Sequence, residues 1–313
     1  NGRPHAEINA IKNSFENIDS SKMYVSLEPC NHYGKTPPCT KSIIKSGISE
    51  VYYSIDDVDK KVKGKSSKIL FKSKIKVKKG LLKNEAKSLY QSYVVNRMKK
   101  LPYVTGKIAI SKDKLIYSKG SQRITDKVSD KLTHFLRYKN DGIIISSRTL
   151  NIDNPKLNCR LKGYEKFSPK RIILDKNLDI SLNSYVFKSA KKGNTIIFYK
   201  SSNNSKIKAL KNKGINLIKS KLNNNNNFDL KIILKKLYIL GVKNLLVEGG
   251  DKITKNLLRK RLIDQFYLFK SPKTLSNNEK KQFFTSLNVL NSYGSKSKIS
   301  SKLAKDTITI YKR

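Results

Sequence analysis

Two cysteines bracket one stretch of this chain, Glu28-Pro29-Cys30-Asn31-His32-Tyr33-Gly34-Lys35-Thr36-Pro37-Pro38-Cys39. A histidine and a glutamate, His5 and Glu7, precede it by about twenty residues. A catalytic zinc ion takes three protein ligands through nitrogen and sulfur and keeps a fourth position for water. His5, Cys30 and Cys39 offer one imidazole and two thiolates. The sequence therefore predicts a zinc site at the front of the chain.

Glu7 lies two residues after His5 and is assigned as a proton carrier, not as a zinc ligand. Zinc lowers the pKa of its bound water to about 7, and a neighbouring carboxylate can pass that proton to a leaving amine. A His-x-Glu pattern followed by Pro-Cys is typical of zinc deaminases, so the predicted reaction is hydrolytic deamination. We expect His5, Cys30 and Cys39 each to lie at or near a helix start, where the backbone dipole favours a thiolate.

Two alternatives stay open at this point. The site could be a closed structural zinc site with His32 as the fourth ligand, or the residues could be unrelated. Two of the three cysteines and two of the three histidines fall between His5 and Cys39, which argues against chance. The long spacing from Cys30 to Cys39 differs from the Pro-Cys-x-x-Cys of nucleic-acid deaminases.

A long predicted helical stretch ends before Pro102, since a proline disfavours the helical conformation of the preceding residue. We place the domain boundary there, which divides the chain into residues 1–100 and 101–313. In the first domain we expect helices at 6–17, 39–46, 67–73 and 82–100, and strands at 23–27, 50–55 and 75–79. In the second we expect buried strands at 103–110, 142–146, 171–174, 195–199 and 244–247, with helices at 127–137 and 229–240. Strands alternating with helices predict a mostly parallel α/β sheet. Residues 265–270 and 307–311 are expected as antiparallel additions at one edge.

The Gly249-Gly250 pair follows a predicted strand and precedes a helix. Without side chains there, backbone N–H groups can approach a cofactor phosphate, although an ordinary tight turn would look the same.

The chain is strongly basic, with 67 Lys and Arg against 23 Asp and Glu among 313 residues, a net charge of +44. The lysines occur on every kind of segment, beside many Asn and Ile. We therefore attribute the charge to an A+T-rich genome and expect no nucleic-acid partner. Three cysteines exclude a disulfide scaffold, and no apolar run approaches the ~20 residues of a membrane span. No secretion signal is recognisable, so we expect a cytoplasmic protein without a membrane partner.

The quoted stretch, together with Pro4-His5-Ala6-Glu7, resembles the bifunctional deaminase/reductase family of riboflavin biosynthesis. Motifs of the second domain follow in the family's order: Pro102-Tyr103-Val104, residues 121–125, Asp153-Asn154-Pro155, residues 171–175 and Val247-Glu248-Gly249-Gly250. The resemblance covers essentially the whole chain. It implies a cytidine-deaminase-like α/β/α domain, N-terminally truncated because the family's opening helix and strands would precede Asn1, followed by a dihydrofolate-reductase-like α/β domain.

The resemblance also implies an activity. The first domain would deaminate 2,5-diamino-6-(ribosylamino)pyrimidinone 5′-phosphate, and the second would reduce the ribosyl group to ribityl with NADPH. His5, Cys30 and Cys39 would coordinate Zn²⁺. The enzyme would be a homo-oligomer, and its substrate would be this small phosphorylated pyrimidine. Two rivals are a reductase alone with a structural zinc remnant, and a nucleic-acid-binding or nucleic-acid-editing deaminase.

Matching motif by motif gives the remaining site residues. His32 and Lys35 would touch the pyrimidine. The substrate's ribose phosphate would contact Ser121, Arg137, Leu157 and Arg160. Glu248 would face the reacting sugar as a catalytic and substrate-binding residue, with Lys107 as a polar catalytic partner at the same site. NADPH would contact Ile110, Arg123, Thr149, Asp153, Gly250, Asp251, Lys252, Ile253, Thr254, Lys255 and Asn256. The chain departs from the family at Ser111-Lys112-Asp113-Lys114, where a turn glycine is replaced by lysine, and at Arg123, which replaces an aromatic residue.

Overall fold

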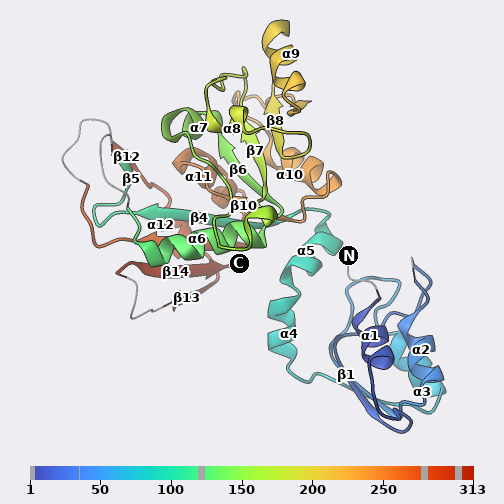
Figure 1. Cartoon of the computed structure of the whole chain (residues 1–313). Coiled ribbons are helices and arrows are strands. Elements are labelled where there is room, and N and C mark those ends of the chain that lie inside the picture. Colours follow the sequence, from blue (N-terminus) through green and yellow to red (C-terminus); the bar gives the residue numbers. More distant parts are fainter. Residues whose placement is uncertain (1–3, 35, 119–123, 276–280, 300–304) are drawn as a thin grey trace. The chain divides into compact units, whose positions relative to one another are not determined.

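The computed structural model describes residues 4–34, 36–118, 124–275, 281–299 and 305–313 (Figure 1). It consists of two compact units, Asn1–Lys100 and Leu101–Arg313. Among the described residues, no helix is both long enough and apolar enough to cross a bilayer.

The first unit holds a parallel three-stranded sheet in the order β1-β2-β3. The strands are β1 (Lys22–Leu27), β2 (Glu50–Ile55) and β3 (Lys76–Lys79), and the helices are α1 (Ala6–Lys12), α2 (Cys39–Lys45), α3 (Ser66–Lys72), α4 (Lys83–Leu89) and α5 (Gln91–Lys99). Its core consists of Met23, Ile43, Ile48, Val51, Leu70 and Ile75. Each strand predicted from the sequence is confirmed within one residue at either end.

Two helices of this unit differ from expectation. The first ends at Lys12 and not at residue 17. The stretch predicted as one helix over 82–100 is divided at Tyr90, whose ψ of 7° departs from helical values. The Tyr90 hydroxyl bonds to that of Ser26 in β1 at 2.8 Å. The apolar spacing continues across this division, so periodicity alone could not reveal it.

A buried carboxylate organises the loops beyond β1 and β2. Glu28 is only 3% exposed and accepts backbone N–H groups from Asp57 (3.1 Å), Gly64 (3.0 Å) and Ser66 (3.1 Å). Glu28 stands two residues before Cys30, so these bonds tie the cysteine loop to the segment that follows β2.

The second unit contains a nine-stranded sheet in the order β13-β14-β11-β4-β10-β6-β7-β8-β9. Its strands are β4 (Tyr103–Ile110), β6 (Gly142–Ser146), β7 (Lys170–Leu174), β8 (Thr195–Tyr199), β9 (Asn216–Lys219), β10 (Asn244–Val247), β11 (Gln265–Lys270), β13 (Ser295–Ile299) and β14 (Thr307–Lys312). The seven strands from β11 to β9 are parallel, as the alternation of strand and helix predicts. A separate antiparallel pair joins β5 (Leu115–Ser118) and β12 (Lys281–Phe283).

Helices cover both faces of this sheet (Figure 1). One face packs against α10 (Leu230–Ile239) and α11 (Asp251–Arg259), the other against α6 (Lys127–Lys139), α7 (Ser147–Asp153), α8 (Tyr185–Lys188) and α9 (Asn204–Asn212). Strand β6 illustrates why the sequence folds this way: Ile144 belongs to one core cluster, and Ile143 and Ile145 belong to the other. A strand buried on both faces reads as a continuous apolar run.

One predicted strand direction is wrong. Residues 265–270 form β11, which pairs parallel with β4 and antiparallel only with β14. Helix α11 lies between β10 and β11 along the chain, and such a crossover returns the next strand in the same direction. The antiparallel prediction for residues 307–311 is confirmed. Strands such as β13, whose five residues are all exposed, lack an apolar run and were missed.

Lys114, at the turn where the family has glycine, adopts a positive φ of 64°. The turn therefore keeps its left-handed backbone without glycine. A short helix, α12 (Leu287–Asn291), and a 3₁₀ turn, Glu165–Phe167, complete the described elements.

Replacing Glu28 by Gln tests the anchoring of the cysteine loop. The amide keeps one oxygen, so we expect the first unit to lose about 1–3 kcal/mol of unfolding free energy. Hydrogen exchange should accelerate at the amides of Asp57, Gly64 and Ser66 in the full chain. The exposed Glu16→Gln is the matched control, and equal exchange rates in both variants would contradict this role of Glu28.

Candidate active sites

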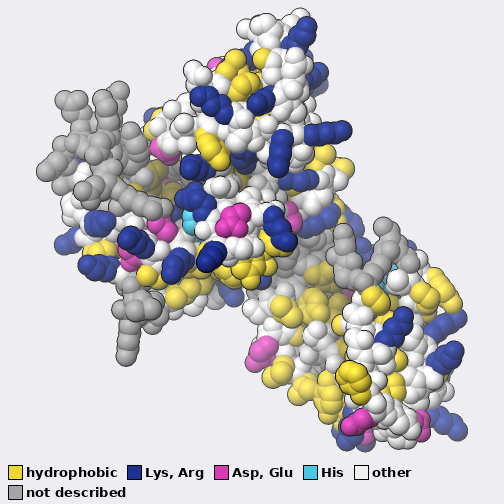
Figure 2. Space-filling view, viewed as in Figure 1, with side chains coloured by type: hydrophobic (Ala, Val, Ile, Leu, Met, Phe, Trp, Pro, Cys, Tyr) yellow, Lys and Arg dark blue, Asp and Glu magenta, His cyan; other side chains and the backbone are white. Residues whose placement is uncertain are grey.

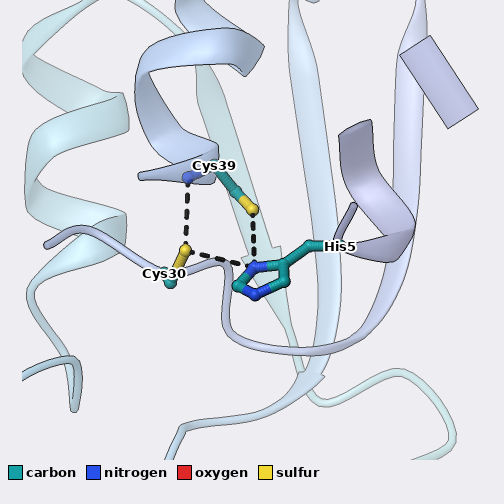
Figure 3. Close-up of side chains that lie close together, drawn as sticks. All are labelled: His5, Cys30 and Cys39. Atoms are coloured by element: carbon teal, nitrogen blue, oxygen red, sulfur yellow. Dashed lines mark hydrogen bonds between the residues drawn. The ribbon is translucent and has the colours of Figure 1, made fainter. Parts of the chain in front are cut away.

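The three predicted zinc ligands lie together (Figure 3). His5 immediately precedes α1, Cys30 lies in the loop after β1, and Cys39 is the first residue of α2. Their ligand atoms all lie within 4.8 Å of one another. His5 Nδ1 is 3.3 Å from the sulfur of Cys39 and 3.5 Å from that of Cys30.

This spacing suits zinc. Ligand atoms about 2.0–2.3 Å from a tetrahedral metal stand roughly 3.5 Å from one another. One nitrogen and two sulfurs are also the donor types that zinc prefers. Within the described residues the ligand group contains these three side chains and not His32, which leaves a fourth position open. That arrangement argues against the closed structural site.

The expectation that every ligand lies at a helix start is wrong for Cys30, which lies in a loop. The thiolate of Cys30 is nevertheless stabilised by a helix start, because Cys30 Sγ accepts the backbone N–H of Cys39 (3.2 Å), the first residue of α2. The hydrogen bond from the Cys39 side chain, assisted by this backbone bond, lowers the pKa of Cys30 to about 5. Cys30 therefore favours the thiolate that a metal binds.

Glu7 lies in the first turn of α1, beside this group. The hydrogen bond with Cys30 raises the pKa of Cys39, burial raises it further, and the carboxylate of Glu7 adds to the effect. Glu7 is therefore close to the ligand sphere without being part of it, as a proton carrier requires.

A cavity of about 240 Å³ opens beside the ligands. Its lining comprises His5, Cys30, His32, Gly34, Thr36, Asp57, Asp59, Val62, Tyr93 and Arg97. His32 Nδ1 is buried and has no hydrogen-bond partner in the described part of the chain, so it can serve a bound ring. Lys35 lies outside the described residues.

Four polar residues of this wall were not predicted from the sequence. Tyr93 donates its hydroxyl to Asp57 (2.8 Å), and Arg97 pairs with Asp59. The signal was present for the acids, because Asp57 and Asp59 follow β2 as Cys30 follows β1. Parallel strands end at one edge, which places both segments together.

The second unit contains a cavity of about 1040 Å³. Its lining includes eight of the residues expected at NADPH: Thr149, Asp153, Gly250, Asp251, Lys252, Ile253, Lys255 and Asn256. Lys107 and Glu248 line it as well. Two residues expected at NADPH are not part of this lining. Ile110 is fully buried in the core. Thr254 is also buried, and its hydroxyl donates a hydrogen bond to the carbonyl of Gly249 (3.3 Å). Ser121 and Arg123 lie outside the described residues.

The first glycine of the pair is required for a steric reason, whereas the second has room for a Cβ. A Cβ on Gly249 would stand 2.1 Å from Ile253 Cγ2, so this position excludes any side chain. Gly250 caps α11, and a Cβ there would face the hydroxyl of Thr149 at 3.5 Å. The backbone at the N-terminus of α11 is thus open to the cavity. A dinucleotide phosphate fits this place, because unpaired N–H groups and the helix dipole favour an anion.

Glu248 and Arg137 form a two-pronged ion pair. Arg137 Nε and one terminal nitrogen donate to the two carboxylate oxygens at 2.8 and 2.7 Å. The other terminal nitrogen donates to the carbonyl of Asn158 (3.1 Å). Burial acts to raise the pKa of Glu248, but the charge and hydrogen bonds of Arg137, with Lys107, lower it. Arg137 thus faces the glutamate and does not reach the cavity itself.

Helix α6 also holds the loop that carries Leu157 and Arg160. The ring Nδ1 of His134 accepts the backbone N–H of Arg160 (3.2 Å), and the carbonyl of His134 accepts the thiol of Cys159 (3.6 Å). Leu157 is buried with a positive φ of 54°. Burial, with the charge of Arg137 and Arg160, lowers the pKa of His134 to about 4. The ring is therefore neutral and remains an acceptor at neutral pH.

The pKa of His134 predicts a pH-dependent stability. The folded state keeps this ring neutral between its ordinary pKa of 6.5 and about 4, while the unfolded chain protonates it. The contribution of this ring to the free energy of unfolding is therefore fully present above pH 6.5. It is lost as the pH falls through this window, with a loss of roughly 3 kcal/mol at the lower end. Denaturant unfolding of His134→Gln should show a correspondingly smaller loss, since an amide oxygen still accepts the Arg160 N–H. An unchanged pH dependence in this variant would refute the assignment.

Comparison with known proteins gives a family match for each unit. Residues 1–55 match the cytidine and deoxycytidylate deaminase zinc-binding region, and residues 102–309 match the RibD C-terminal domain. The riboflavin biosynthesis protein RibD of Aquifex aeolicus is 36% identical over 276 residues, covering 88% of this chain and 75% of that protein. RibD of Chlamydia trachomatis is 31% identical over 281 residues, covering 88% and 74%.

Solved structures share the fold. Acinetobacter baumannii RibD aligns with a TM-score of 0.81 at 24% identity, covering 99% of this chain and 85% of that one. A diaminohydroxyphosphoribosylaminopyrimidine deaminase/5-amino-6-(5-phosphoribosylamino)uracil reductase of Thermotoga maritima aligns with a TM-score of 0.80 at 28% identity, with the same coverage. The expected cytidine-deaminase-like and dihydrofolate-reductase-like folds are confirmed. The chain belongs to the RibD family of deaminase/reductase enzymes of riboflavin biosynthesis.

Proposed function

We propose that this chain performs two consecutive reactions. Asn1–Lys100 would deaminate 2,5-diamino-6-(ribosylamino)pyrimidinone 5′-phosphate, and Leu101–Arg313 would reduce the ribosyl group of the product to ribityl. Zinc and NADPH are the cofactors of the two activities. The observation that carries the proposal is the three-ligand group with Glu7 beside it and a cavity in front, in one chain with a glycine-bordered cavity at Glu248.

In the first unit, bound zinc would activate water for attack on the ring carbon that carries the amino group. Glu7 takes the proton from that water and delivers it to the departing ammonia. His32 presents its unpartnered Nδ1 to the pyrimidine from the cavity wall. Asp57, which accepts the Tyr93 hydroxyl, adds a side-chain carboxyl to the lining of the same cavity.

In the second unit, NADPH supplies a hydride for the sugar. Arg137 holds both oxygens of Glu248, so the carboxylate faces the substrate ionised and in one orientation. Lys107 lines the same cavity and would give a proton to the sugar oxygen. Arg160 lies on the loop that His134 positions, and its guanidinium would bind the substrate's phosphate.

We further propose a cytoplasmic homo-oligomer without a polynucleotide partner. Over the face drawn in Figure 2, Lys and Arg side chains are interspersed with other side chains over many elements. Polynucleotide recognition usually needs a basic patch or stripe.

Glu7→Gln tests the deaminase assignment. The amide cannot accept a proton, so ammonia release from the diamino substrate should fall by about 10²–10⁴-fold while the zinc content stays unchanged. Cys39→Ser should lower both the zinc content and ammonia release, and Glu16→Gln should change neither. Normal ammonia release by Glu7→Gln would exclude Glu7 as the proton carrier. Reductase activity without any ammonia release by the unaltered chain would favour the rival with a structural zinc site.

Arg137→Lys tests the reductase assignment. A lysine cannot hold both oxygens of Glu248, and hydrogen bonds to charged groups contribute about 1.5–3 kcal/mol each, so NADPH oxidation with the deaminated substrate should slow roughly 10–100-fold. Ammonia release in the first reaction should remain normal in the same preparation, which is the internal control. Equal rates of NADPH oxidation in the variant and the unaltered chain would show that the ion pair of Arg137 and Glu248 does not contribute to the reduction.

A further inference from the structure

Phe269, on β11, is a buried aromatic residue that the proposed mechanism does not use. The ammonium of Lys107 lies over its ring, 4.9 Å from the ring centroid. The negative face of an aromatic ring attracts a cation within about 6 Å, so this distance is that of a cation–π contact. The sequence predicted Lys107 as a catalytic residue and Phe269 only as part of a strand.

The register of the sheet places Lys107 between Phe269 and Glu248. On β11, the Cα partner of Lys107 lies two residues before Phe269, so the ring stands on the same face of the sheet as the lysine side chain. On the other side of β4, Gly106 is the Cα partner of Val247 in β10. Each of these two residues is followed by a charged one, which brings Lys107 and Glu248 to the same level. Both charged residues line the 1040 Å³ cavity.

From this placement we propose that Phe269 is a positioning residue of the reductase, whose ring face keeps the ammonium of Lys107 beside Glu248 for proton transfer to the sugar oxygen. This inference rests on the proposed reductase function. Hydride addition to the sugar carbon breaks that carbon's bond to the ring oxygen, and this oxygen takes one proton from the ammonium, which solvent then restores. A ring face attracts a cation but cannot take its proton, so Phe269 does not compete with the substrate for that proton.

The ring supplies an order that the lysine side chain lacks. Lysine carries its charge on a flexible four-carbon stem, and a proton donor must stand within about 2.6–3.2 Å of the atom that it protonates. Phe269 is fully buried, and its core cluster includes Leu136 of α6 and Ile308 of β14. Core packing therefore fixes the ring, and the ring in turn restricts where the ammonium can lie.

The other titratable groups around Lys107 keep one charge state at alkaline pH. Arg137 on α6 stays cationic, and despite burial its charge lowers the pKa of Glu248. Burial lowers the pKa of His134 on α6 to about 4 and raises the pKa of Tyr267 on β11. Between about pH 7 and 10 none of these four groups changes its charge, which leaves Lys107 to account for a fall in rate there.

Phe269→Leu tests this role, because leucine keeps the position apolar but has no ring face. At saturating NADPH, kcat with the deaminated substrate should fall about 2–30-fold with little change in KM, since the lost contact acts on the proton donor. The alkaline limb of the pH–rate profile should move to lower pH by roughly 0.4–1.5 units, because the ring favours the charged ammonium. Acetylation of Lys107 by acetic anhydride, followed against pH by mass spectrometry in the full chain without substrate, should show the same shift, because only the neutral amine reacts.

Phe266→Leu is the matched control. Phe266 lies on the same strand and is also fully buried, but it belongs to the core cluster on the opposite face, where it stacks on Phe284. Both variants should lower Tm, whereas Phe266→Leu should keep the rate, the pH–rate profile and the acetylation profile of the unaltered chain. Phe269→Met replaces the leucine variant if that variant does not fold, since methionine fills irregular core space.

Equal losses of rate in the two leucine variants, or an alkaline limb and an acetylation profile that do not move in Phe269→Leu, overturn this inference but leave the reductase function standing. Failure of the unaltered chain to oxidise NADPH with the deaminated substrate overturns both.

Discussion

Parallel strands all end at the same edge of their sheet, and both units of this chain build their sites at that edge. In the first unit the segments after β1 and β2 bring Cys30 and Asp57 to one cavity. In the second, Glu248 follows β10, Thr149 follows β6 and Lys176 follows β7. Residues as distant in the sequence as Thr149 and Glu248 thus line one cavity because the strands share a direction, and the apolar faces of the strands remain free to form the core.

Buried charges near these edges are paired or hydrogen-bonded. Glu28 and Asp175 accept backbone N–H groups of the loops that border the cavities, and Glu248 is held by Arg137. An unsatisfied buried carboxylate would be costly, so each of these loops has a strongly preferred conformation. The cofactor sites depend on this order, because ligand geometry must be in place before a metal or a dinucleotide binds.

The zinc site could be predicted from the sequence because the types of residue that bind zinc are few and distinctive. An imidazole, two thiols and an adjacent acid have few other uses together, so His5, Glu7, Cys30 and Cys39 were recognisable without coordinates. The apolar runs of β4, β6 and β10 were equally legible. Side-chain pairing could not be predicted in this way. From its position on α6 alone, Arg137 would be expected to be a surface charge, whereas in the structure it pairs with Glu248. The role of His134, the parallel direction of β11 and the cavity walls at Tyr93 and Lys176 depend on tertiary contacts in the same way.

The zinc coordination in the first unit is the central claim, and X-ray absorption at the zinc edge of the purified full chain tests it most directly. The account predicts one zinc per chain, with two sulfurs at about 2.3 Å, one imidazole nitrogen at about 2.0 Å and one further light atom from solvent. Absence of zinc, or a shell with a second imidazole in the fourth position, would contradict it.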